Sequence, residues 1–498
     1  YLCRCRTGMG IKMINPCILS KFMELDPYSN PEFCRLDDLG TSKLFVEVYK
    51  GKILFNKTAD SWFVYNGIKW EEDQGDLKVD DYAKEFAETY KQYMEDTANN
   101  MQLMQIPAEQ REIARKKLEK YCRYIVSLGK RSQRKTIIED ARSYNPVSYE
   151  EFDVQPHLFN CQNGVIDLMS GELLPHSPEL MLSKVANVVY DPQAKCERFD
   201  SFMDEIMCGD AEKVKYLQTL FGYTLGGTNE REEAYFLYGK TTRNGKSTLL
   251  DTIKYLFGDY GMNIQPESLA DQKKSGRAAS GDIARLDGCR LLQMAEPPKS
   301  MNLDVALLKT LTGRDEITAR YLYENDFEFK PIFKLFVNTN YLPLVSDNSL
   351  FASERVKVIT FDRHFESDEQ DLGLKDALIS PESLSGILNW ILQGNKRYRE
   401  NHGVIEMPNS VIIETENYRK HSDKLEVFLT DFAAENVADL YACSILYDKY
   451  VEWCKANNRF QDGKHSFLSG IRKKEGYQQT GTINGKTVKN VFHFEPSD

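Results

Sequence analysis

Short apolar runs alternate with segments of helical period between residues 231 and 365. Tyr235-Phe236-Leu237-Tyr238 and Phe333-Lys334-Leu335-Phe336-Val337 have the length and composition of strands. Arg290-Leu291-Leu292-Gln293-Met294-Ala295 is a third run of this kind. Strands that alternate with helices in this way are typical of an α/β fold. The region therefore predicts an α/β core.

The rest of the chain differs from this core in its periodicity. A β-hairpin is predicted where Asn66-Gly67 joins Ser61-Trp62-Phe63-Val64-Tyr65 to Ile68-Lys69-Trp70, because Asn-Gly is a favoured two-residue turn. Patterns of helical period predict helices, and clusters of turn residues between short apolar runs predict strands. Helices are expected over residues 78–143, 197–226 and 366–432, and mixed strands and turns over residues 1–75 and 150–195.

Composition and charge narrow the class of protein only slightly. The 498 residues are 41% hydrophobic and 28% charged, which is ordinary for a soluble globular protein. There is no apolar run of membrane-spanning length and no secretory signal pattern, so no membrane partner is expected. The eleven cysteines lack paired metal spacing, which favours reduced cytoplasmic thiols. The net charge of −11 by itself does not indicate a DNA-binding protein. Residues 231–365, however, hold 19 Lys and Arg against 18 Asp and Glu, so the acidic excess lies elsewhere and local contacts to DNA are compatible with the charge.

A glycine loop follows the first strand of the α/β core and ends in Gly245-Lys246-Ser247. Strand, glycine loop and helix together form the context of a phosphate-binding loop, in which backbone N–H groups and the helix start face phosphate oxygens. Lys246 would neutralise the β- and γ-phosphates of a nucleoside triphosphate, and Ser247 would bind Mg²⁺. The predicted nucleotide-binding residues are Gly239, Thr242, Arg243, Asn244, Gly245, Lys246, Ser247 and Thr248.

Polar residues at the ends of later strands are candidates for catalysis. Glu296 follows an apolar strand, where a carboxylate can hold Mg²⁺ or activate water, although many such residues merely end a strand. Asn340, ahead of Asn338, is a candidate to sense the γ-phosphate; the alternative is a turn residue before Pro343. Arg355 precedes another strand and could reach a neighbouring subunit's γ-phosphate. The alternative for Arg355 is a surface arginine in an ion pair.

The C-terminal segment has the pattern of a winged helix. Helices are predicted over Ser444–Asn457 and His465–Lys474, and a hairpin turns at Asn484-Gly485. Basic residues gather on the second helix and the wing, where such a fold meets DNA; a protein-docking domain with a solvated basic face is the alternative. The predicted DNA-binding residues here are Arg472, Lys473, Lys474 and Lys486.

These motifs, in this order, resemble superfamily 3 helicases, and within them the phage, plasmid and poxvirus-type primase–helicase family. Thr310–Asp315 is similar to the family's hairpin region, and Asn338–Pro343 is similar to its motif C. Arg355 matches its arginine-finger position. Asn160–Gly171, with Phe221–Gly226, resembles the helical region ahead of the motor. The similarity is expected to run from about Phe152 to the C-terminus.

The resemblance implies an AAA+-like P-loop NTPase core that uses ATP and Mg²⁺. It implies a homo-oligomer, a hexameric ring on single-stranded and forked DNA, which replicates a mobile element in the cytoplasm of a bacterial host cell. The residues before 150 show no paired acids of a primase site, so a helicase without its primase is expected. A separate primase or initiator is then the expected protein partner.

Three features depart from the family pattern. Five residues separate Gly239 from Gly245 instead of four, and Glu296 stands alone where many members carry two acids. The tip of the predicted hairpin, Glu324-Asn325-Asp326, is acidic. An acidic tip repels phosphate, so the expected DNA contacts move to Lys309, Arg314, Arg320 and Lys330.

These patterns and the resemblance together predict five segments. We expect a mixed α+β N-terminal region over residues 1–149 and a family-specific helical domain over 150–230. The superfamily 3 helicase core is expected over 231–365, followed by a helical connector over 366–432 and a winged helix over 433–498.

A replicative DNA helicase is the leading hypothesis for function. An ATP-switched origin-binding or loading factor without processive unwinding is one alternative, and a primase–helicase with a cryptic N-terminal primase is another. Turnover without strand separation would favour the first alternative, and primer synthesis by residues 1–150 would favour the second.

Overall fold

A computed structural model describes most of the chain, and it divides into two compact units. Unit 1 holds the residues up to Tyr190 with two short later segments, and unit 2 holds most of the remainder. The described residues are 15–103, 108–270, 280–298, 301–320, 326–343, 345, 349–435, 440–457 and 461–494.

Helices and a large aromatic core make up most of unit 1. The core is formed by Phe22, Phe45, Phe86 and Tyr90, which pack ring against ring. The expectation of only strands and turns over residues 1–75 is wrong, because two helices form there. Each has a side-chain cap: Asn15 accepts from the first turn of α1, and Asp37 accepts from the first turn of α2. The helices are α1 (Pro16–Leu25), α2 (Asp38–Val48), α3 (Leu77–Leu103), α4 (Ala108–Leu128) and α5 (Arg131–Ala141).

Two small sheets complete unit 1. The first has the order β3-β2-β1-β4 and contains the predicted hairpin. Its turn is longer than predicted: Tyr65 pairs with Trp70, so four residues form the loop and the second strand begins at Trp70 instead of Ile68. The second, β5-β6-β7, confirms the short strands expected after residue 150. The strands are β1 (Ile53–Asn56), β2 (Ser61–Tyr65), β3 (Trp70–Glu72), β4 (Pro146–Val147), β5 (Leu158–Cys161), β6 (Gly164–Asp167) and β7 (Leu173–Leu174).

A five-stranded parallel sheet forms the centre of unit 2 and confirms the predicted α/β core. Its order is β14-β8-β13-β10-β9, and each pair of neighbours is parallel. Strands buried on both faces read as continuous apolar runs, which explains why the sequence showed runs instead of alternation. The strands are β8 (Ala234–Tyr238), β9 (Gly261–Ile264), β10 (Leu291–Ala295), β13 (Lys334–Thr339) and β14 (Val356–Thr360).

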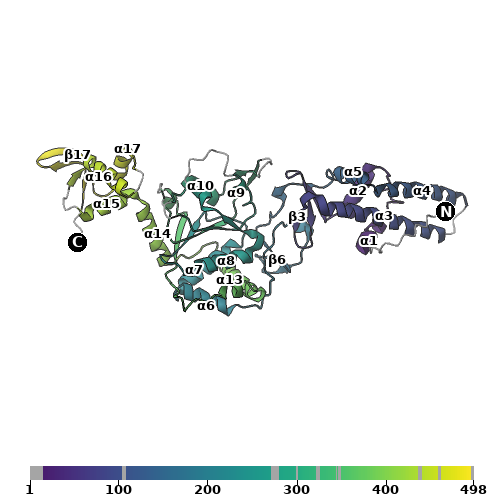
Figure 1. Cartoon of the computed structure of the whole chain (residues 1–498), viewed down its shortest axis with the longest axis horizontal. Coiled ribbons are helices and arrows are strands. Elements are labelled where there is room, and N and C mark those ends of the chain that lie inside the picture. Colours follow the sequence, from purple (N-terminus) through teal and green to yellow (C-terminus); the bar gives the residue numbers. More distant parts are fainter. Residues whose placement is uncertain are drawn as a thin grey trace. The chain divides into compact units, whose positions relative to one another are not determined.

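Helices cover this sheet, and two of them cross in very close contact. In Figure 1, α7 and α13 lie side by side below the strands, and α10 lies above them. A Cβ atom on Gly394 of α13 would lie 1.8 Å from the carbonyl oxygen of Gln218 on α7, so the crossing requires glycine. The helices are α6 (Glu197–Ile206), α7 (Ala211–Thr224), α8 (Lys246–Phe257), α9 (Ser280–Ala284), α10 (Val305–Thr312), α11 (Ser349–Ala352), α12 (Leu374–Leu378) and α13 (Pro381–Glu400).

A two-stranded sheet of β11 (Ile317–Ala319) and β12 (Phe327–Phe329) corresponds to the predicted inserted hairpin. Glu324 and Asn325 of its expected acidic tip lie outside the described residues. Thr310–Asp315 is similar to the family's hairpin region in sequence, but its first three residues form the end of helix α10. Lys309 therefore belongs to a helix, because Asp304 caps that helix and its apolar face packs inward.

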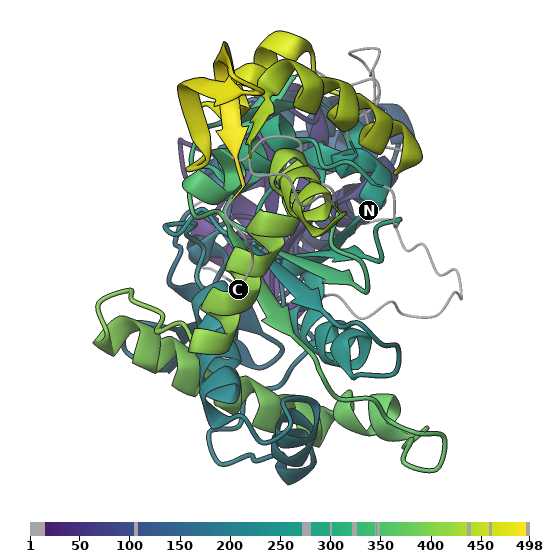
Figure 2. The same cartoon turned by 90° about the vertical axis from the view of Figure 1, so that its left-hand side faces the viewer.

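The C-terminal module has its own small core. Figure 2 shows the yellow hairpin of β16 and β17 beside the module's helices. Phe428, Tyr450 and Phe467 pack together in this core. Asn484 and Gly485 both have positive φ, as a tight hairpin turn requires. The elements are α14 (Asn409–Ser422), α15 (Lys424–Glu435), β15 (Leu440–Ala442), α16 (Cys443–Ala456), α17 (Lys464–Ile471), β16 (Tyr477–Ile483) and β17 (Lys486–His493).

Candidate nucleotide and nucleic-acid sites

The loop between β8 and α8 lies at the carboxyl end of the parallel sheet, where open α/β sheets bind ligands. A Cβ atom on Gly239 would lie 2.2 Å from the Asn244 amide nitrogen and 2.8 Å from Lys246 Nζ. Gly245 has φ +83° and lets the chain turn into α8. The loop thus closes tightly around the lysine side chain, and any larger residue at Gly239 would fill this cradle.

Lys246 is buried, and among the described residues none of its hydrogen-bond partners is a carboxylate. Its ammonium donates to Oδ1 of Asn244 at 3.0 Å and to Oδ1 of Asn340 at 2.8 Å. The side chain is 3% exposed, and burial lowers the pKa of Lys246 to about 8, with Glu296 opposing that shift. A buried cation held by two amide oxygens favours binding of an anion, because phosphate would supply the missing negative charge.

A second amide from the same strand reaches the residue after the lysine. Asn338 on β13 donates to Oγ of Ser247 at 2.9 Å. Asn338 and Asn340 are two positions apart, so they share one face at the end of β13. Glu296 follows β10 beside Asn338: its N–H donates to the Asn338 carbonyl at 2.9 Å, and its side chain is exposed. The predicted residues Lys246, Ser247, Glu296 and Asn340 are thus brought to one edge of the sheet.

The outer part of the loop is held by the segment after β14. His364 Nδ1 lies 2.8 Å from the carbonyl oxygen of Thr242. The backbone N–H of Phe365 donates to the Arg243 carbonyl at 2.9 Å, and the Arg243 guanidinium donates to Ser367 at 3.2 Å. Thr242 and Arg243 therefore have structural partners in the described residues. Thr248 lies in the first turn of α8.

Sequence reasoning missed a polar contact beneath this site. Gln293, in the middle of β10, donates to Oδ1 of Asp251 on α8 at 3.2 Å. Lys375 pairs with the other oxygen of Asp251 at 3.0 Å. A glutamine inside an apolar strand was the signal, because a buried amide needs a partner.

Arg355 forms hydrogen bonds with residues of its own chain. Its guanidinium bonds Glu232 Oε2 at 2.5 Å, Thr312 Oγ1 at 3.0 Å and the Lys309 carbonyl at 3.2 Å. The side chain is 17% exposed. The structure therefore contains the ion pair that the sequence analysis offered as the alternative for Arg355. A role of Arg355 toward another subunit stays a prediction.

The four predicted DNA-binding residues around the hairpin all contact partners within the chain. Arg314 lies 3.2 Å from Glu232, Arg320 lies 3.7 Å from Asp326, and Lys330 lies 3.6 Å from Glu316. Lys309 donates to Ser349 at 2.6 Å. Exposed ion pairs of this kind are weak, so they do not exclude exchange with a phosphate group.

The four predicted residues of the C-terminal module differ in accessibility. Arg472, Lys473 and Lys486 are exposed. Lys474 instead pairs with Asp423 at 2.8 Å and also bonds Glu426. Lys474 therefore has a structural role within the module, which sequence reasoning did not foresee because its partners lie about fifty positions away.

Comparisons with known proteins find similarity to viral proteins named as helicases and primases. Residues 42–208 match the family described as "D5 N terminal like", and residues 237–355 match a family of unknown function, DUF5906. The chain is similar to "Putative helicase L207/L206" of Acanthamoeba polyphaga mimivirus, with 30% identity over 338 residues. It is also 23% identical over 333 residues to "Putative primase C962R" of African swine fever virus.

The D5 match and the viral relatives named as helicases and primases support a member of the phage and viral superfamily 3 primase–helicase family. This member aligns with the mimivirus protein over 63% of its own length and 35% of the relative's, and with the swine fever protein over 62% and 34%. The D5 match begins at residue 42, so family similarity starts well before Phe152, where sequence reasoning placed it.

The chain was also compared with solved structures. The apo NrS-1 C-terminal region superposes with a TM-score of 0.48 at 13% identity and covers 92% of this chain and 99% of that one. Within the described part of the chain, no helix has both the length and the apolar character needed to cross a bilayer.

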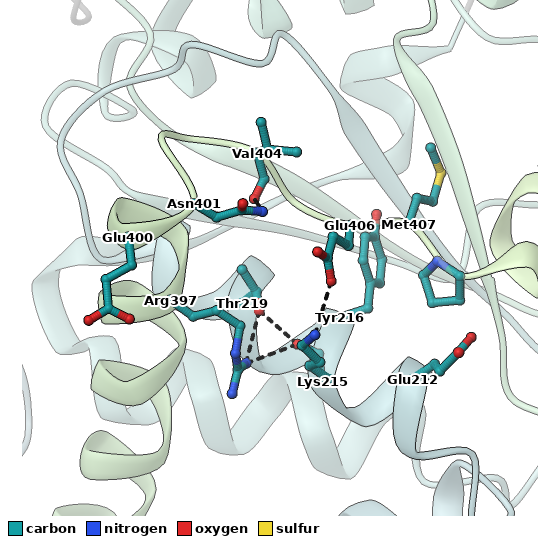
Figure 3. A pocket seen from close by; sticks show the side chains of 11 residues that line it. Glu212, Lys215, Tyr216, Thr219, Arg397, Glu400, Asn401, Val404, Glu406 and Met407 are labelled. Carbon is teal, nitrogen blue, oxygen red and sulfur yellow. Dashed lines mark hydrogen bonds and ion pairs between the residues drawn. The ribbon is translucent and has the colours of Figure 1, made fainter.

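A separate pocket of about 430 Å³ lies between α7, the end of α13 and the loop that follows it (Figure 3). Lys215 and Glu406 pair across it at 2.9 Å, and Arg397 donates to Thr219 at 3.1 Å. None of its lining residues belongs to the loop between β8 and α8. The pocket is therefore distinct from the predicted nucleotide site of this family member.

Proposed function

We propose that this chain is the ATP-driven motor of a replicative DNA helicase. The observation that carries the proposal is the buried Lys246 ammonium, held by the amide oxygens of Asn244 and Asn340 at the end of a strand, glycine loop and helix. Family membership and the similarity to viral proteins named as helicases support the same function.

The residues at this site fit ATP and Mg²⁺. Lys246 would exchange its two amide partners for β- and γ-phosphate oxygens, and its charge would be stabilised there. Ser247 would turn its hydroxyl from Asn338 to the metal, and Glu296 would hold and polarise a water molecule. Asn340, once released by Lys246, would be free to contact the γ-phosphate. When bound, Mg²⁺ supplies positive charge that offsets the charge developing on the phosphates.

The DNA contacts are proposed on two surfaces. Arg314 precedes β11 and Lys330 follows β12, whereas Arg320 follows β11 on the side of the turn. All three are exposed, so a phosphate group can replace their weak ion pairs. Arg472, Lys473 and Lys486 would bind phosphates through the C-terminal module, in the manner of a winged helix. No contact to base edges is proposed, because these side chains would act on the backbone alone.

A hexameric ring with ATP between subunits completes the proposal. Arg355, oriented by Glu232, would stabilise charge at the neighbouring subunit's γ-phosphate. A separate primase would act with the ring in the cytoplasm of a bacterial host. Because Arg355 is engaged within its own subunit, an ATP-switched loader without unwinding is the second candidate. In a loader, ATP binding alone would drive the change of state.

ATP turnover with and without single-stranded DNA tests the proposal. The purified chain should hydrolyse ATP faster with DNA, and Lys246→Ala and Arg355→Ala should each lose at least a hundredfold of that rate. Lys240→Ala is a matched control, because Lys240 lies in the same loop but is exposed. Full turnover by Lys246→Ala would refute the nucleotide site. ATP hydrolysis that is slow and is not accelerated by DNA, in the absence of strand separation, would favour the loader.

A further inference from the structure

Glu232 is a carboxylate shared by two arginines to which the proposed mechanism gives different roles. Its Oε2 accepts from Nη2 of Arg355 at 2.5 Å, and its Oε1 lies 3.2 Å from Nε of Arg314. Arg355 is the proposed arginine toward the neighbouring subunit, and Arg314 stands at the base of the proposed DNA hairpin. One side chain therefore contacts both parts of the proposed motor.

The backbone of Glu232 is held in an unusual conformation. Its φ is +55°, in the left-handed region that a glutamate rarely adopts. Such a conformation persists when its surroundings enforce it, and it often marks a functional position. The surroundings here include Asn229, whose amide donates to the carbonyls of Thr312 at 2.9 Å and Gly313 at 3.3 Å. The segment before β8 is thus fastened to the end of α10, directly before Arg314.

The two ion pairs differ in how easily they can be exchanged. Arg314 is 60% exposed and also donates to the backbone carbonyl of Glu230, and its pair with Glu232 is accessible to a competing anion. Arg355 is 17% exposed and has two further acceptors at the end of α10, so its position is fixed by several bonds at once. A DNA phosphate would therefore displace Glu232 from Arg314 first. The Glu232 carboxylate would then pair with Arg355 alone.

We propose that Glu232 is a positioning residue that links DNA contact at Arg314 to the orientation of Arg355. Without DNA, the carboxylate is divided between the two guanidinium groups. With DNA on Arg314, it holds Arg355 alone and fixes the direction in which that guanidinium points. The inference rests on the proposed function, since it assigns a regulation to the same ATP site.

Two measurements on the full chain with Glu232→Gln test this role. DNA-stimulated kcat should fall about tenfold, while KM for ATP should change less than twofold, because the loop around Lys246 is untouched. Affinity for a single-stranded oligonucleotide should rise about threefold, because Arg314 is released from its carboxylate. Opposite changes in turnover and DNA affinity cannot come from a damaged fold. Glu230→Gln is the matched control, since its exposed carboxylate contacts only the Tyr398 hydroxyl among the bonds described, and both quantities should stay at wild-type values.

A double-mutant cycle decides whether the two arginines communicate through Glu232. If the carboxylate links the two arginines, the double variant with Glu232→Gln and Arg314→Gln should show the same DNA stimulation of ATP turnover as Glu232→Gln alone, because both substitutions remove the same contact. Independent losses that multiply in the double variant would overturn the inference, as would unchanged kcat and DNA affinity in Glu232→Gln. Where Gln prevents folding, Glu232→Asp serves instead, because aspartate tolerates a left-handed backbone but is too short to bridge both arginines. Absent ATP turnover in the wild type would refute the proposed function, and the DNA-affinity measurement would still decide the Glu232–Arg314 contact.

Discussion

Replacing Lys246 with methionine should stabilise the nucleotide-free protein while it abolishes ATP binding. Methionine matches the length of the lysine stem but carries no charge. In the free protein the ammonium is buried, its hydrogen-bond partners in the described part of the chain are two neutral amide oxygens, and its pKa is lowered from 10.5 to about 8. The folded state therefore keeps this charge at a cost that the unfolded chain does not carry.

The size of the effect follows from the pKa shift. A shift from 10.5 to about 8 corresponds to about 3 kcal/mol between the two charge states, taken as an upper limit. The two amide oxygens lose their donor in the variant, which costs about 1 kcal/mol each. We therefore expect a net stabilisation of about 1 kcal/mol at neutral pH. The cost of the charge is complete below pH 8, where both states are protonated. It declines as pH rises from about 8, where the folded state loses the proton, to 10.5, where the unfolded state does.

Urea unfolding of wild type and Lys246→Met at pH 7 and pH 9.5 measures this effect. The relevant transition is the one whose midpoint ATP raises in the wild type. The variant should have the higher midpoint at pH 7, a smaller advantage at pH 9.5, and no response to ATP at either pH. Lys240→Met should change neither the midpoint nor its pH dependence, because Lys240 is exposed. A variant that is less stable than wild type at pH 7, or an advantage independent of pH, would refute the reasoning.

Three further predictions concern catalysis, DNA contact and packing. Glu296→Gln should keep ATP affinity, measured by calorimetry, but lower turnover about a hundredfold, as expected for a lost water-activating group. Removing Arg472 and Lys473 together should reduce the slope of log affinity against log salt for single-stranded DNA by about 1.4, because two phosphate contacts are lost. Lys474→Ala should instead lower the melting temperature, since two carboxylates hold the Lys474 ammonium within the module. Gly394→Ala should destabilise unit 2 by about 2 kcal/mol, seen as an earlier melting transition, because its methyl group would collide with the α7 backbone; an unchanged transition would contradict the close crossing.

Local sequence signals predicted the elements whose cause is local. The strand, loop and helix around Lys246 and the Asn484-Gly485 turn depend on a few adjacent residues and form where the sequence placed them. The hairpin at Asn66-Gly67 also forms, but its second strand begins at Trp70, two residues later than predicted. Helices α1 and α2 escaped prediction because they are short and α2 is buried on several sides, which hides its helical period.

Contacts between distant residues could not be read from the sequence. Lys246 and Asn340 are 94 positions apart, and only the order of the strands brings them together. Glu232 gave no signal, since a charged residue before a strand is normally solvated. Its two arginine partners become visible only when the end of α10 and the start of β14 are placed beside it.

The close crossing of α7 and α13 also has a consequence for how the chain is made. Asn395 on α13 donates to the carbonyl of Gly222 on α7 at 2.8 Å, across a sequence separation of 173 residues. At about 5–20 residues per second, a ribosome needs on the order of 10–30 s to travel from one partner to the other. During that interval the apolar surface of α7 has been synthesised and its final partner has not. Nascent chains of this protein should therefore bind chaperones most strongly between these two points of translation.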